Sequence, residues 1–401
     1  MVIPELNLRH LRLMLAVTQT GSITTAAARC NISQPAATQA LKKLEATFAQ
    51  PLFERTTKGI FPTSSGAALA ARIERALGLL DAAANPFGSR LHLTASTARL
   101  KALIEVAHSQ NFSLAARSLG IAQPTVHRAI TQLEQDLGRP LFRRTQFGIV
   151  PTRVGHQLAQ AAQLAFAELA QGQMELEETG GNARLTITIG GMPLSRAFLL
   201  PKAMAQFQRR YPQVNFRIVE GPYETLLAGL LRAEIDLLLG ALRTPPPVAD
   251  IVQEYLFEDE VVIVSASGHQ LAREIRPDLR RALDFPWVIP FSGTPARRHF
   301  DAEIERAGLP PPFTVVETSS MILMRELLHQ GPYLGVVSRL QAIGEIENGL
   351  MTALPIPIED SRRAIGLTMR SNWRPTPMQK QFLDSVRGEF GHRASPAIEN
   401  S

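Results

Sequence analysis

The chain has 401 residues, of which 45% are hydrophobic, and a formal net charge of +6. This length predicts two to four domains with sizeable cores. A single cysteine, Cys30, excludes an intrachain disulfide and Cys-based metal sites, so we expect it to be a small core residue. No apolar run reaches the roughly 18 residues of a membrane span and the N-terminus lacks a signal pattern, which predicts a cytoplasmic protein. We expect no metal and no cofactor.

The excess positive charge lies in the first part of the chain. Residues 1–180 contain 18 Lys and Arg residues and 12 Asp and Glu residues, which gives a net charge of 18 − 12 = +6. The remaining residues contain 24 of each kind, which gives a net charge of 24 − 24 = 0. This distribution favours a phosphate-binding N-terminal part joined to a neutral body that binds something else.

One helical pattern occurs twice, in residues 8–66 and 97–155, at a constant offset of 123 − 34 = 89 positions. Roughly a third of the aligned positions are identical, which is typical of a repeated supersecondary unit. The matches include Gln34-Pro35 with Gln123-Pro124, Leu44-Glu45 with Leu133-Glu134, Pro51-Leu52-Phe53 with Pro140-Leu141-Phe142, Pro62-Thr63 with Pro151-Thr152, and Gly66 with Gly155.

In the first copy, the apolar spacing predicts a helix from residue 8 to Gly21, a short helix over 24–29, a tight turn and a third helix over 35–48. Two helices joined by a short turn after a supporting helix form a helix-turn-helix. Residues 51–63 predict two short strands around a turn, which is a wing. Together these elements predict a DNA-reading module in each copy.

A long helix is expected after each wing, from residue 64 or 65 to 84 and from 154 to 178. Each carries a narrow apolar stripe, Leu69 to Leu80 in the first and Leu158 to Leu169 in the second. Such stripes suit the pairing of one helix with another.

The remainder alternates apolar strands with amphipathic helices, which predicts a mostly parallel α/β layer. The series breaks near residues 265–269 and rejoins near Ser338, so we expect two lobes with a cleft between them. The expected strands cover residues 185–189, 214–219, 236–239, 261–265, 287–290, 313–317, 334–337 and 365–369, with helices over 194–210 and 223–232.

This order of elements resembles the LysR-type transcriptional regulators, and both copies carry that family's local signature. In the first copy it includes Ser33-Gln34-Pro35-Ala36 and Pro51-Leu52-Phe53-Glu54-Arg55, and in the second Ala122-Gln123-Pro124 and Pro140-Leu141-Phe142-Arg143-Arg144. The second half is similar to the family's effector domain, and Gly293-Thr294-Pro295 and Val316-Glu317-Thr318 resemble the galactose-binding-protein regulator subgroup. One departure is clear, because the family's usual chain has a single DNA-binding unit.

The resemblance implies a mixed fold of two all-α winged helix-turn-helix domains with linker helices, followed by a two-lobed α/β effector domain like a periplasmic binding protein. We expect the domains at residues 1–66, 67–89 (linker helix and connector), 90–155, 156–182 (linker helix) and 183–390, with a disordered tail over 391–401.

A recognition helix needs short polar or charged groups on its outward, N-terminal side, where base edges lie. The candidates for base contact are Gln34, Pro35, Thr38, Gln39 and Lys42 in the first copy and Gln123, Pro124, Thr125, His127 and Arg128 in the second. Arg55, Lys58, Arg143 and Arg144 are placed on the wings for phosphate or minor-groove contact. Because Ala122 replaces the N-capping Ser33, the second helix loses a cap worth on the order of 1 kcal/mol.

The resemblance places a small effector, such as a sugar or related metabolite, in the interlobe cleft. Polar groups that follow strands can bind an oxygen-rich ligand there. The candidates are Ser195, Ser292, Gly293, Thr294, Thr318 and Ser319. No phosphate loop, metal-spaced His cluster or catalytic triad motif appears, so an enzyme is not expected.

The sequence therefore predicts a sequence-specific, metabolite-responsive regulator whose partners are double-stranded DNA, an effector, further copies of the chain in a dimer or tetramer, and RNA polymerase. The alternative is a ligand-independent architectural DNA-binding protein or repressor. Two assemblies stay open: the two linker helices pair within one chain, or they pair between chains to give four heads per dimer.

Overall fold

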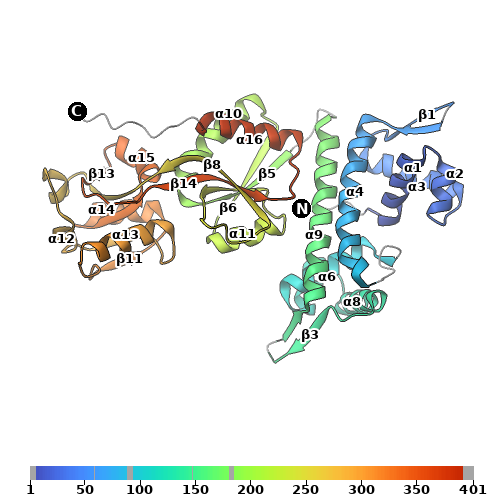
Figure 1. Ribbon diagram of the computed structural model, residues 1–401, viewed down its shortest axis with the longest axis horizontal. Coiled ribbons are helices and arrows are strands. Elements are labelled where there is room, and N and C mark those ends of the chain that lie inside the picture. The colour runs from blue at the N-terminus through green and yellow to red at the C-terminus, as the bar shows by residue number, and fades with distance from the viewer. Residues whose placement is uncertain (1–5, 58, 88–93, 147, 180–184, 392–401) are drawn as a thin grey trace. The chain divides into compact units, whose positions relative to one another are not determined.

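The computed structural model describes residues 6–57, 59–87, 94–146, 148–179 and 185–391 (Figure 1). The chain divides into an N-terminal unit, residues 1–185 with 375–378, and a C-terminal unit, residues 186–374 with 379–401. Apart from Gly391, the tail expected over 391–401 lies outside the described residues, as does the end of each predicted linker.

The first copy of the repeat, here called head one, contains three helices and a two-stranded wing. Gly21 ends the first helix in a left-handed conformation (φ 64°), and the Ser22 side chain then accepts a hydrogen bond from the Thr25 N–H to begin the second. The elements are α1 (Leu8–Thr20), α2 (Ile23–Arg29), α3 (Gln34–Phe48), β1 (Phe53–Thr56) and β2 (Gly59–Pro62). The helix-turn-helix and the wing are confirmed.

The second copy, head two, repeats this arrangement. Asn111 begins its second helix by accepting hydrogen bonds from the N–H groups of Ser113 and Leu114, at 2.8 and 3.1 Å. Its elements are α6 (Thr97–Ser109), α7 (Phe112–Leu119), α8 (Gln123–Leu137), β3 (Phe142–Thr145) and β4 (Gly148–Pro151). The antiparallel register of the two wings corresponds residue by residue, from Phe53 opposite Pro62 to Phe142 opposite Pro151.

The linker helices α4 (Ser64–Ala84) and α9 (Arg153–Thr179) lie side by side (Figure 1). They run antiparallel, since Gln50, just before the first wing, donates to the carbonyl of Leu176, close to the end of α9. The predicted stripes are buried, and one continuous apolar core runs through both heads and both linker helices. Both stripes are therefore used for helix pairing.

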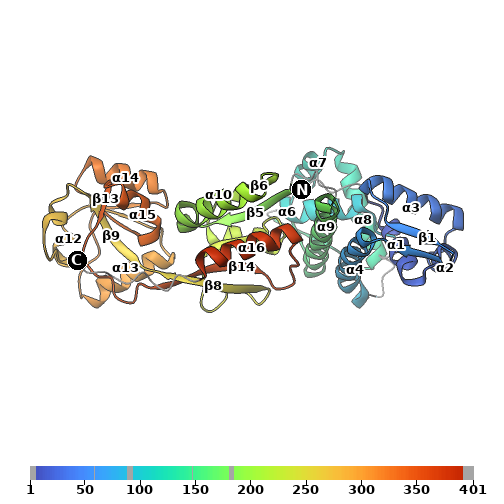
Figure 2. The same ribbon diagram turned by 90° about the horizontal axis from the view of Figure 1, so that it is seen from above.

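The C-terminal unit contains two five-stranded sheets, one in each lobe, and Figure 2 shows β8 and β14 running between them. Lobe one has the strand order β6-β5-β7-β14-β8. Its elements are β5 (Leu185–Gly191), the π-helical turn η2 (Ser195–Leu199), α10 (Leu200–Arg210), β6 (Val214–Val219), α11 (Tyr223–Leu231), β7 (Leu237–Ala241), β8 (Ile251–Asp259), β14 (Arg363–Arg370) and α16 (Pro377–Phe390).

Lobe two has the strand order β11-β10-β12-β9-β13, with an apolar cluster on each face of the sheet. Trp287, in the central part of this sheet, is completely buried. The elements are β9 (Val261–Ala266), η3 (Gln270–Arg273), α12 (Leu279–Ala282), β10 (Trp287–Ile289), α13 (Pro295–Arg306), β11 (Val315–Glu317), α14 (Met321–Gln330), β12 (Leu334–Ser338), α15 (Arg339–Glu347) and β13 (Met351–Ala353).

Three details of the sequence prediction are wrong. The sheets are mixed, because β14 pairs antiparallel with β7 and β8, and β9 with β12 and β13. The strands β8 and β13 were not expected; β8 carries Gln253 and Glu254, which interrupt its apolar pattern. The crossovers between the lobes fall at Glu260 and at residues 354–362, rather than near 265–269 and Ser338.

Candidate nucleic-acid interface and effector cleft

In both heads, three signature residues attach the wing to the helices. The Glu45 carboxylate accepts hydrogen bonds from the N–H groups of Leu52 and Phe53, at 3.0 and 3.3 Å, and Thr63 donates to the carbonyl of Pro51 at 2.9 Å. A Cβ on Gly66 would lie 1.9 Å from the Leu52 carbonyl oxygen, so only glycine fits there.

Head two repeats these contacts almost unchanged. Glu134 accepts from the N–H groups of Leu141 and Phe142 at 2.8 and 3.4 Å, Thr152 donates to a proline carbonyl at 2.9 Å, and a Cβ on Gly155 would lie 2.0 Å from the Leu141 oxygen. The residues that the two copies share are therefore those that build the scaffold, and both copies keep a complete one.

The first turns of α3 and α8 are exposed in both heads. Gln34, Pro35, Gln39 and Lys42 are exposed, and Thr38 is half-buried and donates to the carbonyl of Gln34. In head two the predicted residues Gln123, Pro124, Thr125, His127 and Arg128 are all exposed. Each helix thus presents the predicted polar face to solvent.

The two recognition faces differ in chemistry and in rigidity. Thr38 corresponds to His127, Gln39 to Arg128 and Lys42 to Thr131. The His127 ring packs 5.3 Å from that of Phe112, and Gln123 accepts a hydrogen bond from Ser113 at 3.1 Å. Ser33 caps α3 through the Ala36 N–H, whereas Ala122 makes no side-chain cap to α8.

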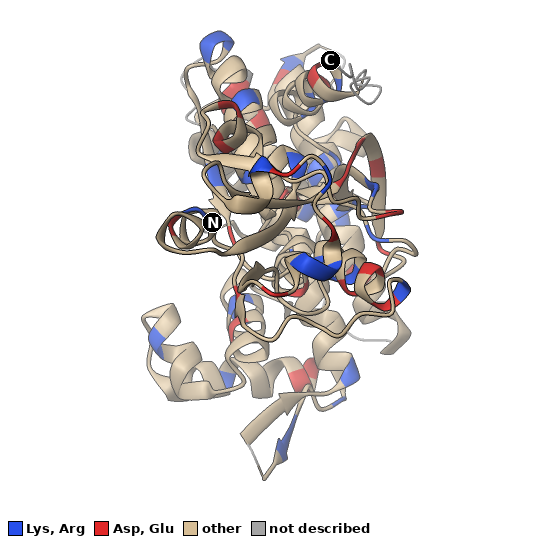
Figure 3. Cartoon of the chain, turned by 90° about the vertical axis from the view of Figure 1, so that its left-hand side faces the viewer, with Lys and Arg blue, Asp and Glu red and all other residues tan. Residues whose placement is uncertain are grey.

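The wing arginines have no acidic partner among the described residues. Arg55, Arg143 and Arg144 are exposed, and in Figure 3 the projecting hairpin of the second wing has a stretch in the blue of Lys and Arg. Lys58 lies outside the described residues. Arg12 and Arg99, whose side chains are only partly exposed, are by contrast paired with Asp81 and Asp136. The wing arginines are therefore available on an exposed surface, where phosphates could neutralise them.

A charged cluster lies inside the α4–α9 pair, where Arg72 is only 3% exposed. Its guanidinium contacts Glu168 at 3.0 Å, Gln171 at 2.7 Å and Glu175 at 3.1 Å, and Arg75 also contacts Glu168 at 2.9 Å. Burial lowers the pKa of Arg72, but the hydrogen bonds and charges of the two glutamates outweigh it and raise the pKa. The cation is thus fully compensated in this pairing.

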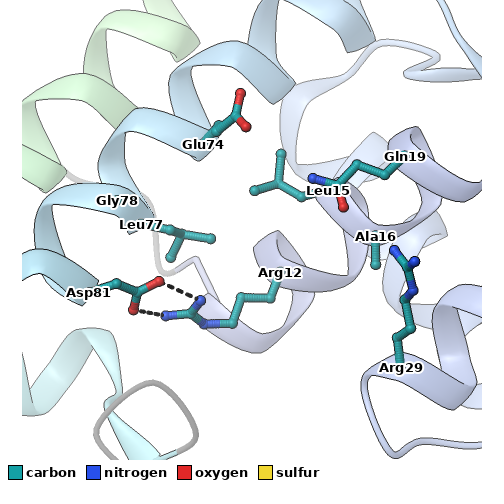
Figure 4. A pocket seen from close by; sticks show the side chains of 9 residues that line it. All are labelled: Arg12, Leu15, Ala16, Gln19, Arg29, Glu74, Leu77, Gly78 and Asp81. Carbon is teal, nitrogen blue, oxygen red and sulfur yellow. Dashed lines mark hydrogen bonds and ion pairs between the residues drawn. The ribbon is translucent and has the colours of Figure 1, made fainter. Parts of the chain in front are cut away.

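A pocket of about 350 Å³ lies where α1 of head one meets α4 (Figure 4). The bidentate ion pair of Arg12 with Asp81 spans it, at 3.0 and 2.6 Å. In head two the corresponding positions are Lys101 and Ala170, so this ion pair is specific to head one.

The predicted effector residues of lobe two meet at one edge of its sheet. Because β10 and β11 are parallel neighbours, the segments after them, with Ser292, Gly293 and Thr294 and with Thr318 and Ser319, come together. The Thr294 hydroxyl donates to the Phe291 carbonyl and caps α13, and that of Thr318 accepts from the Ser320 N–H. These two hydroxyls hold the loops in shape, whereas Ser292, Gly293 and Ser319 are exposed.

Ser195, the candidate in lobe one, is completely buried and donates to the carbonyl of Met192 at 2.7 Å. Its hydroxyl is therefore already used within its own turn η2, which packs against α15 of lobe two.

The sequence analysis missed a charged group at the crossovers. Asp259, at the end of β8, accepts from Ser338, from the N–H of Leu340 at 3.1 Å and from Arg363 at 3.1 Å. It thereby links the end of β8 in lobe one to Ser338 and Leu340 in lobe two. In the sequence Asp259 lies between Glu258 and Glu260, and nothing in this acidic run distinguishes it for such a role.

Comparison with known proteins bears on both units. A family model described as bacterial regulatory helix-turn-helix protein, lysR family, matches residues 8–67 and 97–156, and the LysR substrate binding domain matches residues 180–391. The chain is 32% identical over 385 residues to the HTH-type transcriptional regulator GalR of Pseudomonas putida, covering 95% of this chain and 96% of that protein. The chain belongs to the LysR family.

Further LysR relatives match less of this chain. HTH-type transcriptional regulator PcaQ of Agrobacterium fabrum is 25% identical over 292 residues, which cover 73% of this chain and 94% of that protein. Among solved structures, full-length OxyR from Pseudomonas aeruginosa has a TM-score of 0.53 at 24% identity and covers 73% of this chain and 95% of its own. CbnR complexed with its target DNA has a TM-score of 0.51 at 17% identity, covering 73% of this chain and 99% of its own.

Membership of the LysR family confirms the main functional predictions. The protein is a DNA-binding transcriptional regulator with a domain for a small-molecule effector, and its family is not one of enzymes. In the described part of the chain, no helix has the length and apolarity for a membrane crossing, and no cluster of His, Cys, Asp or Glu could hold a metal ion. The similarity to the galactose-binding-protein regulator subgroup stays a prediction.

Proposed function

We propose that this LysR regulator reads one operator whose two half-sites differ, with one head on each. The observation that supports this most directly is the pattern of sequence differences between the heads. The scaffold contacts of Glu45 and Thr63 recur at Glu134 and Thr152, while the exposed recognition faces diverge. Because Arg reads guanine and Gln reads adenine, the exchange of Gln39 for Arg128 changes the preferred base.

A selection experiment with full-length protein and random DNA tests this proposal. The wild type should select a composite site with two unlike halves. The quadruple variant Thr125→Ala, His127→Thr, Arg128→Gln and Thr131→Lys, which gives α8 the face of α3, should select halves that are alike. Each altered base contact should change discrimination by about 1–3 kcal/mol. An unchanged composite site in the variant, or a single half-site for the wild type, contradicts the proposal.

We further propose that the two heads are presented by one chain, through pairing of its own α4 with its own α9. The charges make this pairing heterotypic: Arg72 and Arg75 lie on α4, and their counterparts on α9 are Ala161 and Leu164. The acidic partners lie only on α9, since the counterpart of Glu168 on α4 is Leu79. In a like pair of α4 helices Arg72 would face Leu79 in place of Glu168, and its buried charge would lack compensation, which disfavours pairing of like helices.

Charge reversal distinguishes pairing within a chain from exchange between chains. Arg72→Glu should abolish binding to the two-half operator, and adding Glu168→Arg and Glu175→Arg to the same chain should restore it. The controls are mixtures in which one chain carries Arg72→Glu and the other carries the two glutamate reversals. Restoration in the mixture would show that helices pair between chains and would contradict the proposal, while leaving family membership intact.

For the C-terminal unit, we propose that the effector binds between the lobes, against Ser292, Gly293 and Ser319. These residues are exposed at the edge where β10 and β11 end, and the crossovers at Glu260 and 354–362 allow the lobes to move. An effector shifts DNA binding only if it binds open and closed lobes with different affinity. The double variant Ser292→Ala and Ser319→Ala should weaken effector-dependent changes in the DNase footprint and leave DNA affinity unchanged. Loss of both the effector response and the DNA affinity would indicate misfolding.

We also propose that the protein works in the cytoplasm, because the DNA that its family binds is there. Further copies of the chain are expected as partners, with the α4–α9 pair as the building unit. Sedimentation of the full-length protein with and without operator DNA measures how many chains share one site.

A further inference from the structure

The loops between the lobes carry a group of basic side chains that the sequence analysis did not select. Arg243 follows β7 in lobe one, Arg298 lies in the first turns of α13 in lobe two, and Arg363 begins β14 at a crossover. The charges of Arg298 and Arg363 act on Arg243, and both also act on His299. Three segments far apart in the sequence therefore bring guanidinium groups to one place between the lobes.

Arg243 is held in position although its charge has little compensation. Gln253 on β8 accepts from the Arg243 N–H at 2.9 Å and donates to its carbonyl at 2.7 Å, which fixes the backbone. The guanidinium carbon lies 4.4 Å from the centre of the Tyr223 ring. Stacking of this kind orients a guanidinium and leaves its N–H groups available.

Several polar atoms of this group are buried without a hydrogen-bond partner. They are Nη1 of Arg243, the hydroxyl oxygen of Tyr223 and Nε of Arg363. Buried polar atoms are almost always paired in folded proteins, so this group can offer several hydrogen bonds to an acceptor from outside the chain. Arg298 is exposed, and no ion pair joins it to the described residues.

The nearby acids neutralise only part of the group. Asp259 pairs with Arg363, and Glu224 and Asp360 lie near Arg243 and His299, respectively. Burial is the largest cause of the lowered pKa of Arg243. Arg298 and Arg363 lower this pKa further, and Tyr223 and Glu224 raise it by less than burial and the two arginines together lower it. Burial also lowers the pKa of His299, which favours its neutral form. The site is thus arranged for a negative charge that comes from elsewhere.

We propose that the effector is a small organic anion whose carboxylate or phosphate group binds Arg243, Arg298 and Arg363, with the Tyr223 hydroxyl as a further donor. This rests on the proposed effector function and names its ligand class. Guanidinium groups match the paired oxygen atoms of these anions. Because the arginines come from both lobes and a crossover, the anion favours the arrangement of the lobes that brings them together. A neutral sugar offers no charge to this group.

Calorimetric titration of the full-length protein, without DNA and at constant ionic strength, tests the ligand class. The probes are matched pairs that differ in charge: galacturonate and galactose, glucose 6-phosphate and glucose, benzoate and benzamide, with inorganic phosphate as the smallest anion. At least one anion should bind, and its neutral partner should not. Comparison of the carboxylate probes with the phosphate probes shows which of the two anionic groups the site binds.

Variants on one helix supply the control. Arg298→Gln should weaken binding of the anion about 10-fold or more, since it removes a charge-assisted hydrogen bond. Arg297→Gln, on the neighbouring residue, should leave binding unchanged, because Arg297 is already paired with Asp301 at 2.7 Å and Glu317 at 2.6 Å. Both variants are titrated with whichever anion binds the wild type: galacturonate, glucose 6-phosphate or benzoate.

Three results overturn the inference: a neutral probe that binds as well as its anionic partner, full affinity in Arg298→Gln, or no binding by any anion up to millimolar concentration. DNase footprinting distinguishes failure of the proposed ligand class from failure of the proposed effector control of DNA binding. An anion that binds at the arginines without changing the DNA footprint preserves the ligand class and contradicts effector control. A neutral probe that changes the DNA footprint supports effector control and contradicts the proposed ligand class.

Discussion

Replacing Arg72 by methionine should destabilise the N-terminal unit by about 3 kcal/mol. Methionine keeps the length of the side chain but removes the cation that faces Glu168 and Glu175. Breaking a buried ion pair by removing one partner costs roughly 3–5 kcal/mol because a charge stays behind without compensation. We expect the lower end because Glu168 keeps Arg75 at 2.9 Å and the two carboxylate side chains are 11% and 17% exposed.

Two spectroscopic signals report this change separately. The two tryptophans, Trp287 and Trp373, lie in the C-terminal unit, so their fluorescence follows the unfolding of that unit alone. The loss of helix, followed by circular dichroism, includes the helical N-terminal unit. For a unit of this size, about 3 kcal/mol corresponds to a shift of roughly 6–12 °C in the circular dichroism transition. The fluorescence transition should stay in place.

The double variant Arg72→Met with Glu175→Gln is the control, and it should recover part of the loss because one uncompensated carboxylate is gone. The reasoning is refuted if Arg72→Met shifts the helical transition by less than about 1 kcal/mol, which is the range of a solvated ion pair. An equal shift in the fluorescence transition would also refute it, since the effect would then not belong to the α4–α9 pair.

Three further changes test local features of the structure. Gly66→Ala should destabilise head one by several kcal/mol because the new Cβ would meet the Leu52 carbonyl. A Cβ at Gly78 on the same helix would have no atom within 4 Å, so Gly78→Ala should stabilise the protein by about 0.5–1 kcal/mol in thermal melts. Ala122→Ser should add the cap that α8 lacks and raise stability by about 1 kcal/mol; an unchanged melting curve argues against the cap. Burial raises the pKa of Asp236 from 3.8 to about 6, so the wild type should lose stability relative to Asp236→Asn as the pH rises from 4 to 6. Because this side chain is half-buried, we expect about 1–2 kcal/mol by tryptophan fluorescence, and a difference constant over this range would contradict the shift.

Local rules account for what could be predicted from the sequence. Helix periodicity, the caps at Ser22 and Ser33 and the glycine at position 21 act over a few residues, so the helices and both wings appear in the sequence pattern. The duplication is visible because both copies need the same short-range contacts, such as Glu45 to Leu52 and Glu134 to Leu141. The exposed faces of the recognition helices follow from the same periodicity.

Only the tertiary structure decided which distant residues meet. The sequence left open whether the linker helices pair within one chain or between chains, and the antiparallel α4–α9 contact depends on Arg72 reaching Glu168, 96 positions away. The strand β8 and the antiparallel pairing of β14 were hidden because cross-strand partners, not local pattern, stabilise them. Arg243, Arg298 and Arg363 belong to three segments without a shared motif. Folding brings their charges together, because long-range contacts place residues by topology rather than by their neighbours in the chain.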